Sequence, residues 1–136
     1  MFVVRAIQDK ALQEEICNIL KTDYKENSLA FFAADLKDDG TNIDKYISIC
    51  QFYLNKMGEI VNFTAADGRN EDEAVIVMLR TVMSFMYRCG VKVAAFSDGS
   101  VNDWWLAKSG FIEQNGTYMM DLEKFYTSPC KYSEEK

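Results

Sequence analysis

The first residues that suggest chemistry lie in the stretch DGRNEDEAVIVML, from Asp67 to Leu79. A glycine and an arginine precede a long apolar run, an order typical of a loop that holds a phosphate at the start of a helix. The first backbone N–H groups of a helix lack partners inside the helix and therefore attract anions. However, Glu71, Asp72 and Glu73 put three carboxylates at that position. The layout predicts a phosphate loop, and the charge argues against one.

The same residues also have a purely structural interpretation. Asn70 is a favourable N-cap, and Glu73 three residues later completes a pattern like a capping box. Acidic side chains in the first turn also complement the helix dipole. On this interpretation the helix start is satisfied by its own side chains, and we favour it over a working phosphate site.

The composition excludes several kinds of chemistry. The chain has 136 residues, a net charge of −6 and no histidine, which excludes a histidine-based triad and most zinc sites. The negative charge argues against nucleic acid and an anionic membrane surface as partners. Without a CxxC pair we expect no metal site and free thiols in a reducing cytosol; the cysteines are Cys17, Cys50, Cys89 and Cys130. The start has no signal-peptide pattern and no run approaches bilayer length, so we expect a cytoplasmic protein.

Hydrophobic periodicity predicts an α/β fold with a single mixed, mostly antiparallel sheet of about seven strands and flanking helices. Helices are expected after an N-cap at Asp9, along the apolar stripe from Val75 to Met86, and from about Val101 to Ser109. Strands are expected at 2–7, 28–36, 45–54, 59–66, 91–96, 111–114 and 117–122.

From Gly58 to Leu122 this order of elements resembles the GNAT acetyltransferases. The strand EIVNFTAA leads into the loop DGRNEDEA and a long helix, followed by the strand VKVAAF. The motif KSGF then resembles the family's closing Gly-Phe, and YMMDL resembles its last strand. The resemblance implies a GNAT-like fold with one domain over residues 1–126, followed by a polar C-terminal tail at 127–136.

The resemblance also implies how a cofactor would bind. In the family, the loop after the fourth strand reads Arg/Gln-x-x-Gly-x-Gly/Ala, and its backbone N–H groups hold the pyrophosphate of acetyl-CoA. Arg69 matches the first position and Ala74 the last, whereas Asp72 replaces the central glycine and should weaken the binding of acetyl-CoA. The implied cofactor-binding residues are Thr64, Ala65, Ala66, Arg69, Asn70, Glu71, Asp72, Glu73, Ala74 and Asn102.

Catalytic groups follow from the resemblance in the same way. Glu59 is the only carboxylate on the fourth strand, where family enzymes often carry a general base. The tyrosine that often protonates the leaving thiolate is replaced by Leu106, four residues before Gly110. Tyr118 in the last hairpin is an alternative acid. Both candidates also have structural interpretations, as an exposed acid at a strand end and as an ordinary strand residue.

Strict alternation along the fourth strand predicts which side chains share a face. It places Glu59, Val61 and Phe63 on one face, and Ile60, Asn62 and Thr64 on the other. Asn62 is polar in an otherwise apolar run. It either contacts a ligand where the central strands part or is satisfied by backbone groups in a bulge.

Two functions stay open on the sequence. The first is an acetyltransferase that passes an acetyl group from acetyl-CoA directly to a neutral amine of a small molecule or protein, with Glu59 or water as base. The second is a catalytically degenerate GNAT-like domain that serves as a binding or interaction module, as Asp72 and Leu106 suggest. A third and weaker hypothesis is an enzyme with a less anionic acyl donor. The acceptor and the oligomeric state stay open.

Overall fold

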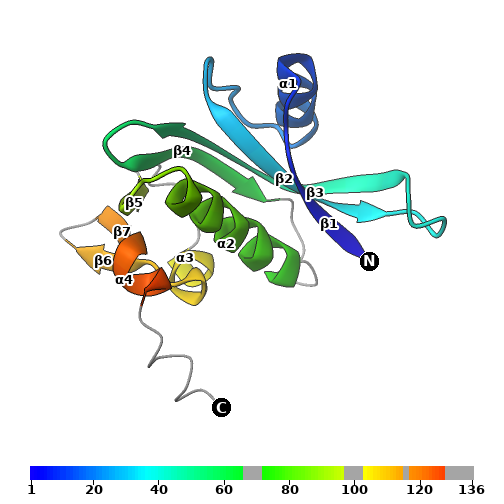
Figure 1. The fold of residues 1–136 in the computed structure, drawn as a ribbon. Coiled ribbons are helices and arrows are strands. Elements are labelled where there is room, and N and C mark those ends of the chain that lie inside the picture. Colours follow the sequence, from blue (N-terminus) through cyan, green and yellow to red (C-terminus); the bar gives the residue numbers. More distant parts are fainter. Residues whose placement is uncertain (66–71, 97–102, 115–116, 128–136) are drawn as a thin grey trace, which may run out of the picture.

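The computed structural model describes residues 1–65, 72–96, 103–114 and 117–127. These residues contain all seven predicted strands and all three predicted helices, together with a fourth helix near the end (Figure 1). The elements are β1 (Phe2–Ala6), α1 (Lys10–Ile19), β2 (Leu29–Leu36), β3 (Ile43–Leu54), β4 (Gly58–Ala65), α2 (Asp72–Arg88), β5 (Val93–Phe96), α3 (Asp103–Ser109), β6 (Ile112–Gln114), β7 (Thr117–Asp121) and α4 (Leu122–Tyr126).

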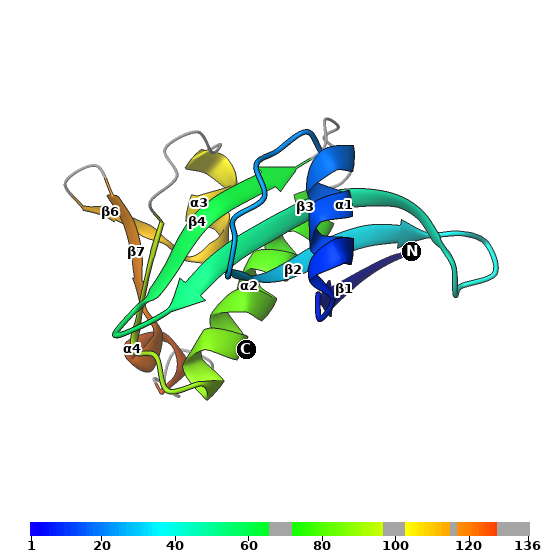
Figure 2. The ribbon, with the colours of Figure 1, turned by 90° about the horizontal axis from the view of Figure 1, so that it is seen from above.

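The strands form one sheet in the order β1-β2-β3-β4-β5-β7-β6. Every neighbouring pair is antiparallel except β4 and β5, which are parallel. This confirms the predicted mixed, mostly antiparallel sheet. Helix α1 covers one face of the sheet and α2 the other (Figures 1 and 2). None of the helices in the described part of the chain combines the length and apolar character that crossing a bilayer requires.

Two cores follow from this arrangement. The α1-side core contains Ile16 and Cys17 of the helix and Phe32 and Ile49 of the sheet. The α2-side core is larger and holds the predicted apolar stripe of α2, every member of which is at most 1% exposed: Val75, Met78, Leu79, Val82, Met83 and Met86. Both faces of the central strands are therefore covered, which explains their nearly continuous apolar sequences.

The ends of the two long helices follow from local sequence. The carboxylate of Asp9 accepts a hydrogen bond from the backbone N–H of Ala11 at 3.0 Å, which confirms the predicted N-cap of α1. Helix α2 ends at Arg88, and Gly90 just beyond it has a φ of +91°, a left-handed conformation that favours glycine. The N–H of Val91 then donates to the carbonyl of Met86 at 3.1 Å and closes the helix.

A bulge in β4 corrects the predicted faces of that strand. Gln51 of β3 pairs with Asn62, but Phe52 pairs with Ile60, so Val61 is an extra residue. The extra residue reverses the alternation, and Ile60 and Phe63 therefore both pack in the α2-side core. Strict alternation placed these two side chains on opposite faces, and that prediction is wrong because a period of two holds only where the ladder is regular.

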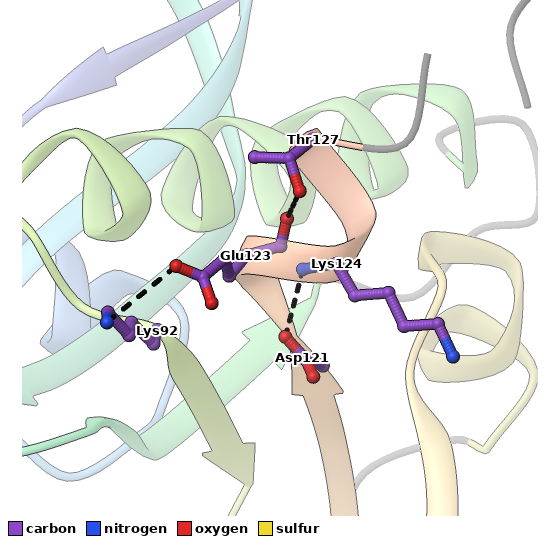
Figure 3. A network of polar contacts seen from close by, with 5 residues as sticks. All are labelled: Lys92, Asp121, Glu123, Lys124 and Thr127. Carbon is purple, nitrogen blue, oxygen red and sulfur yellow. Dashed lines mark hydrogen bonds and ion pairs between the residues drawn. The ribbon is translucent and has the colours of Figure 1, made fainter. Parts of the chain in front are cut away.

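Helix α4 is the element that the sequence did not predict. The last strand ends at Asp121, whose carboxylate accepts from the N–H of Lys124 at 3.0 Å and caps α4 (Figure 3). Lys92 pairs with Glu123 at 3.7 Å, and the Thr127 hydroxyl donates to the Glu123 carbonyl. Helix α4 is therefore linked through Lys92 to the residue just before β5.

Candidate functional site

The candidate site lies where β4 continues past β5. Their parallel register contains Gly58↔Ala94, Glu59↔Ala95 and Ile60↔Phe96. The described part of β5 reaches Phe96, whereas β4 runs on to Ala65 and stays paired with β3 (Figure 2). In open α/β sheets ligands bind at the carboxyl ends of strands where neighbours separate. The carboxyl end of β4 lies beyond its last described pair with β5 and precedes α2 in the chain.

Helix α2 starts at Asp72, close in sequence to this end of β4. Glu73 is exposed in its first turn, whereas Ala74 is 1% exposed and packs in the α2-side core. A small residue at position 74 is thus required by packing. Of the other implied cofactor-binding positions, Ala66, Arg69, Asn70, Glu71 and Asn102 lie outside the described residues, so their contacts stay predictions.

Glu59 and Tyr118 lie on opposite faces of the sheet. Glu59 pairs with Tyr53, whose hydroxyl donates to the carbonyl of Glu26 at 2.7 Å, in the segment that follows α1. Tyr118 pairs with Phe96 and packs against the α2-side core. Because directly paired residues share a face, Glu59 belongs to the α1 side and Tyr118 to the α2 side. The structure therefore does not bring the two catalytic candidates together.

Solved structures with the same arrangement are acetyltransferases. A variant of spermidine N-acetyltransferase from Vibrio cholerae matches with a TM-score of 0.64 at 11% identity, covering 94% of this chain and 98% of that one. IAA acetyltransferase from Bacillus cereus matches at 0.60 and 18% identity, covering 89% and 99%. A chain of the NatC complex bound to Gag peptide and CoA matches at 0.63 and 12% identity, covering 88% and 98%.

The chain has the GNAT fold. No protein-family profile matches the sequence, and no curated protein is matched by it. The likeness therefore rests on the shape of the backbone, and what this GNAT-like chain does has to be argued from its own side chains.

Leu106, at the position where the family resemblance implies a tyrosine, is a core residue. Its side chain is 2% exposed and belongs to the α2-side core. The position at which the sequence comparison expects a phenolic acid is thus occupied by an apolar core residue. A hydroxyl at this place would need a buried partner, because an unsatisfied polar group in a core is destabilising.

A chain of buried amides on the α1 side of the sheet was not predicted as a unit. Gln13 and Gln51 are fully buried and Asn62 is 6% exposed. Gln13 Nε2 donates to Gln51 Oε1 at 2.8 Å, Gln51 Nε2 donates to Asn62 Oδ1 at 2.8 Å, and Asn62 Nδ2 donates to Thr22 Oγ1 at 2.8 Å. Thr22 Oγ1 lies 2.7 Å from Thr64 Oγ1. We call these five residues the polar chain.

The polar chain resolves the two interpretations of Asn62. Its amide is satisfied by the side chains of Gln51 and Thr22 rather than by backbone groups, although the bulge is directly beside it. The sequence does contain a signal for the polar chain, because Gln51 interrupts the apolar run ISICQFYL. Polar residues that interrupt buried strands at neighbouring positions are candidates for mutual hydrogen bonds.

The polar chain also fixes the segment between α1 and β2. Lys21 and Asn27, with φ of 58° and 66°, are left-handed residues at the two ends of this segment. Between them, the N–H of Lys25 donates to Gln51 Oε1 at 2.9 Å, and Gln51 Nε2 donates to the carbonyl of Asp23 at 2.8 Å. A segment without regular structure is therefore held on the sheet by side-chain hydrogen bonds from Gln51, Tyr53 and Asn62.

The thiol nearest to this segment is Cys17. Burial raises its pKa to about 11, and the negative charges of Glu14 and Asp23 act in the same direction. A thiol that keeps its proton is a poor nucleophile. Cys17 therefore acts as a core residue, as the spacing of the cysteines indicated.

Proposed function

We propose that this protein is an N-acetyltransferase that transfers an acetyl group from acetyl-CoA to an amine. The observation that supports the proposal most strongly is that β4 runs on past Ile60, the last residue of its described pairing with β5, within a GNAT fold. By their names, two of the similar structures acetylate small molecules, and a third is bound to CoA. The acceptor is proposed only as an amine, because the fold is shared by enzymes with different acceptors.

The described residues fit an extended, amide-bearing ligand such as the pantetheine arm of CoA. Beyond Ile60, the edge of β4 that faced β5 is not paired with another described strand, whereas the opposite edge stays paired with β3 as far as Ala65. A strand edge offers alternating N–H and C=O groups to an extended chain. Thr64 and Ala65 lie in this part of β4, in agreement with the contacts implied for them by the sequence.

Acetyl-CoA would supply a thioester carbonyl carbon to which the amine nitrogen forms a new C–N bond as the C–S bond breaks and the nitrogen loses a proton. Glu59 is the proposed base and is half-buried on the α1 side of the sheet, where Tyr53 is its neighbour. Tyr118 lies on the other face, so we propose that water rather than Tyr118 protonates the leaving thiolate. The start of α2 would face the pyrophosphate, and its acidic residues would weaken that contact.

Calorimetric titration with CoA tests the proposal, with Asp72→Gly as the informative variant. We expect weak binding to the wild type and tighter binding to Asp72→Gly, because the substitution removes both a side chain and a negative charge. Asp38→Gly is the matched control, since it removes the same charge in an exposed turn and should bind as the wild type does. Absence of binding to both the wild type and Asp72→Gly, at CoA concentrations in the millimolar range, would rule the proposal out.

The second candidate function is a GNAT-like binding module without catalysis, which the burial of Leu106 favours. Mass spectrometry of a panel of polyamines, aminoglycosides and peptides incubated with acetyl-CoA separates the two functions. An acetylated amine that appears only with folded protein supports the enzyme. Binding of CoA to Asp72→Gly without any acetylated product supports the binding module.

A further inference from the structure

Backbone groups set the direction of each hydrogen bond that an amide side chain makes within the polar chain. A backbone N–H can only donate, so the atom of Gln51 that receives the N–H of Lys25 must be its oxygen. A backbone carbonyl can only accept, so the atom of Gln51 that contacts the carbonyl of Asp23 must be its nitrogen. The orientation of this amide, which is often ambiguous in structures, is therefore determined here.

The orientation of Gln51 determines that of Asn62 in turn. Because Gln51 Nε2 donates, the atom of Asn62 that it reaches at 2.8 Å must be Oδ1. The other end of the Asn62 amide is then Nδ2, which donates to Thr22 Oγ1. In all three amide hydrogen bonds of the polar chain, the proton consequently points away from α1 and toward the pair formed by Thr22 and Thr64.

This direction leaves the pair with one hydroxyl proton to spare. Thr22 and Thr64 carry two hydroxyl protons, and their mutual contact at 2.7 Å uses one of them. Thr22 already accepts from Asn62, which uses a lone pair and no proton. Whichever threonine donates to the other, the second proton has no acceptor side chain among the residues that the structure describes.

The hydroxyl of Ser28, which contacts Gln13 of the polar chain, both accepts and donates a hydrogen bond and therefore provides a contrast. Ser28 Oγ accepts from Gln13 Nε2 at 2.9 Å and donates to the carbonyl of Lys25 at 2.7 Å. Lys10 lies at the Gln13 end of the polar chain. Its ammonium group contacts the carbonyl of Ser28 and lies 3.4 Å from Gln13 Oε1. A cation at the donor end of aligned hydrogen bonds polarises them in one direction and strengthens the last donor.

The spare donor lies at the candidate site. Thr64 is on β4 beyond the last pair with β5, and its partner Ile49 belongs to the α1-side core, which places Thr64 on the α1 face. Thr22 comes from the segment between α1 and β2. Both threonines are half-buried, whereas Gln51 behind them is fully buried. The two threonines thus lie at the end of β4 that extends beyond its last described pair with β5.

We infer that the Thr22–Thr64 hydroxyl pair is a hydrogen-bond donor site for an uncharged carbonyl or hydroxyl oxygen of a bound ligand. The inference rests on the proposed function for the identity of that ligand. The oxygen belongs either to an amide of the pantetheine arm or to the amine-bearing acceptor. Asn62, Gln51 and Gln13 act as positioning residues, because they set the direction in which the pair donates.

Substitution of the hydroxyl tests the inference. In a Thr22→Val background, where Thr64 carries the one remaining hydroxyl of the pair, Thr64→Val keeps the shape and removes the donor, Thr64→Ser keeps the donor, and Thr81→Val is the control because its hydroxyl bonds to the Val77 carbonyl within α2. If the pair faces the acyl donor, Thr64→Val should weaken CoA binding about 2- to 12-fold, the range expected for one neutral hydrogen bond. If it faces the acceptor, CoA binding stays unchanged and the KM for the acetylated amine rises by the same factor. Thr64→Ser should restore the affected constant in either case.

A second measurement separates failure of the inference from failure of the proposed function. Threonine methyl NMR of the wild type, titrated with N-acetylcysteamine as a carbonyl-bearing fragment of the arm and with spermidine as an amine without a carbonyl, reports on the pair directly. A shift of the Thr22 and Thr64 methyl signals by the first probe, with the Thr81 signal unmoved, supports the donor site even if CoA does not bind. Unmoved Thr22 and Thr64 signals, together with unchanged binding constants in Thr64→Val, overturn it.

Discussion

Gly58 and Met86 are in direct contact at the closed end of β4 and β5. A Cβ atom added to Gly58 would lie 2.3 Å from Sδ and 2.8 Å from Cε of Met86, which is fully buried in α2. Gly58 is also the first residue of β4 that pairs with β5, opposite Ala94. The absence of a side chain at position 58 therefore allows α2 to pack closely where the two strands are still joined.

Gly58→Ala is expected to lower the free energy of unfolding by about 1 to 3 kcal/mol, because overpacking displaces the end of the Met86 side chain. Urea denaturation measures the change. In a Met86→Ala background the same substitution should be less destabilising, because the contact has been removed and the two effects are coupled. Equal effects of Gly58→Ala in both backgrounds would contradict the contact.

Gln51→Leu should lower the free energy of unfolding by at least about 2 kcal/mol. The substitution removes the donor to Oδ1 of the buried Asn62, and an unsatisfied buried group costs about 1 to 3 kcal/mol. It also removes the partner of the part-buried N–H of Lys25. Gln8→Leu is the matched control at an exposed position and should change stability by less than about 0.5 kcal/mol. Hydrogen exchange should also become faster at Lys25 in Gln51→Leu alone. Equal stabilities of the two variants would show that the polar chain contributes little.

The sequence predicted the order of elements because apolar periodicity and turn residues are local signals. The stripe of α2, the N-cap at Asp9 and the stop at Gly90 are all of this kind, and all are confirmed. A single extra residue at Val61 leaves no such signal, because it depends on the register with β3. The face of Ile60 was therefore predicted wrongly relative to Phe63.

The candidate site was less predictable than the fold for a related reason. Thr64 and Thr22 are 42 residues apart in sequence, and their contact exists only once α1 and the segment after it have packed on the sheet. Alignment of a loop motif cannot reveal such a pair. The family resemblance suggested Glu59 as a base, and Tyr118 was an alternative acid, whereas the pairing of the strands places the two on opposite faces.

Cys17 is expected to make stability fall at alkaline pH. Burial raises the pKa of its thiol in the folded protein from 9.0 to about 11. Between these values the unfolded chain has released the proton and the folded chain has kept it, so the free energy of unfolding decreases as pH rises. Cys17→Ala should show a smaller decrease between pH 9 and pH 11 in urea titrations, since both proteins share every other titrating group. The same slope in both would mean that the thiol does not contribute.

Leu106→Tyr tests whether the missing phenol can be restored by one substitution. The side chain of Leu106 is 2% exposed in the α2-side core, so a larger residue there should lower stability by about 1 to 3 kcal/mol, with a further penalty for a buried hydroxyl. Leu106→Met conserves volume and should cost less than about 1.5 kcal/mol. We expect no gain in acetyl transfer from Leu106→Tyr, because the side chain at position 106 packs in the core. A faster transfer rate that shows a new alkaline pKa in Leu106→Tyr, measured against Leu106→Phe, would show instead that this position reaches the reacting atoms.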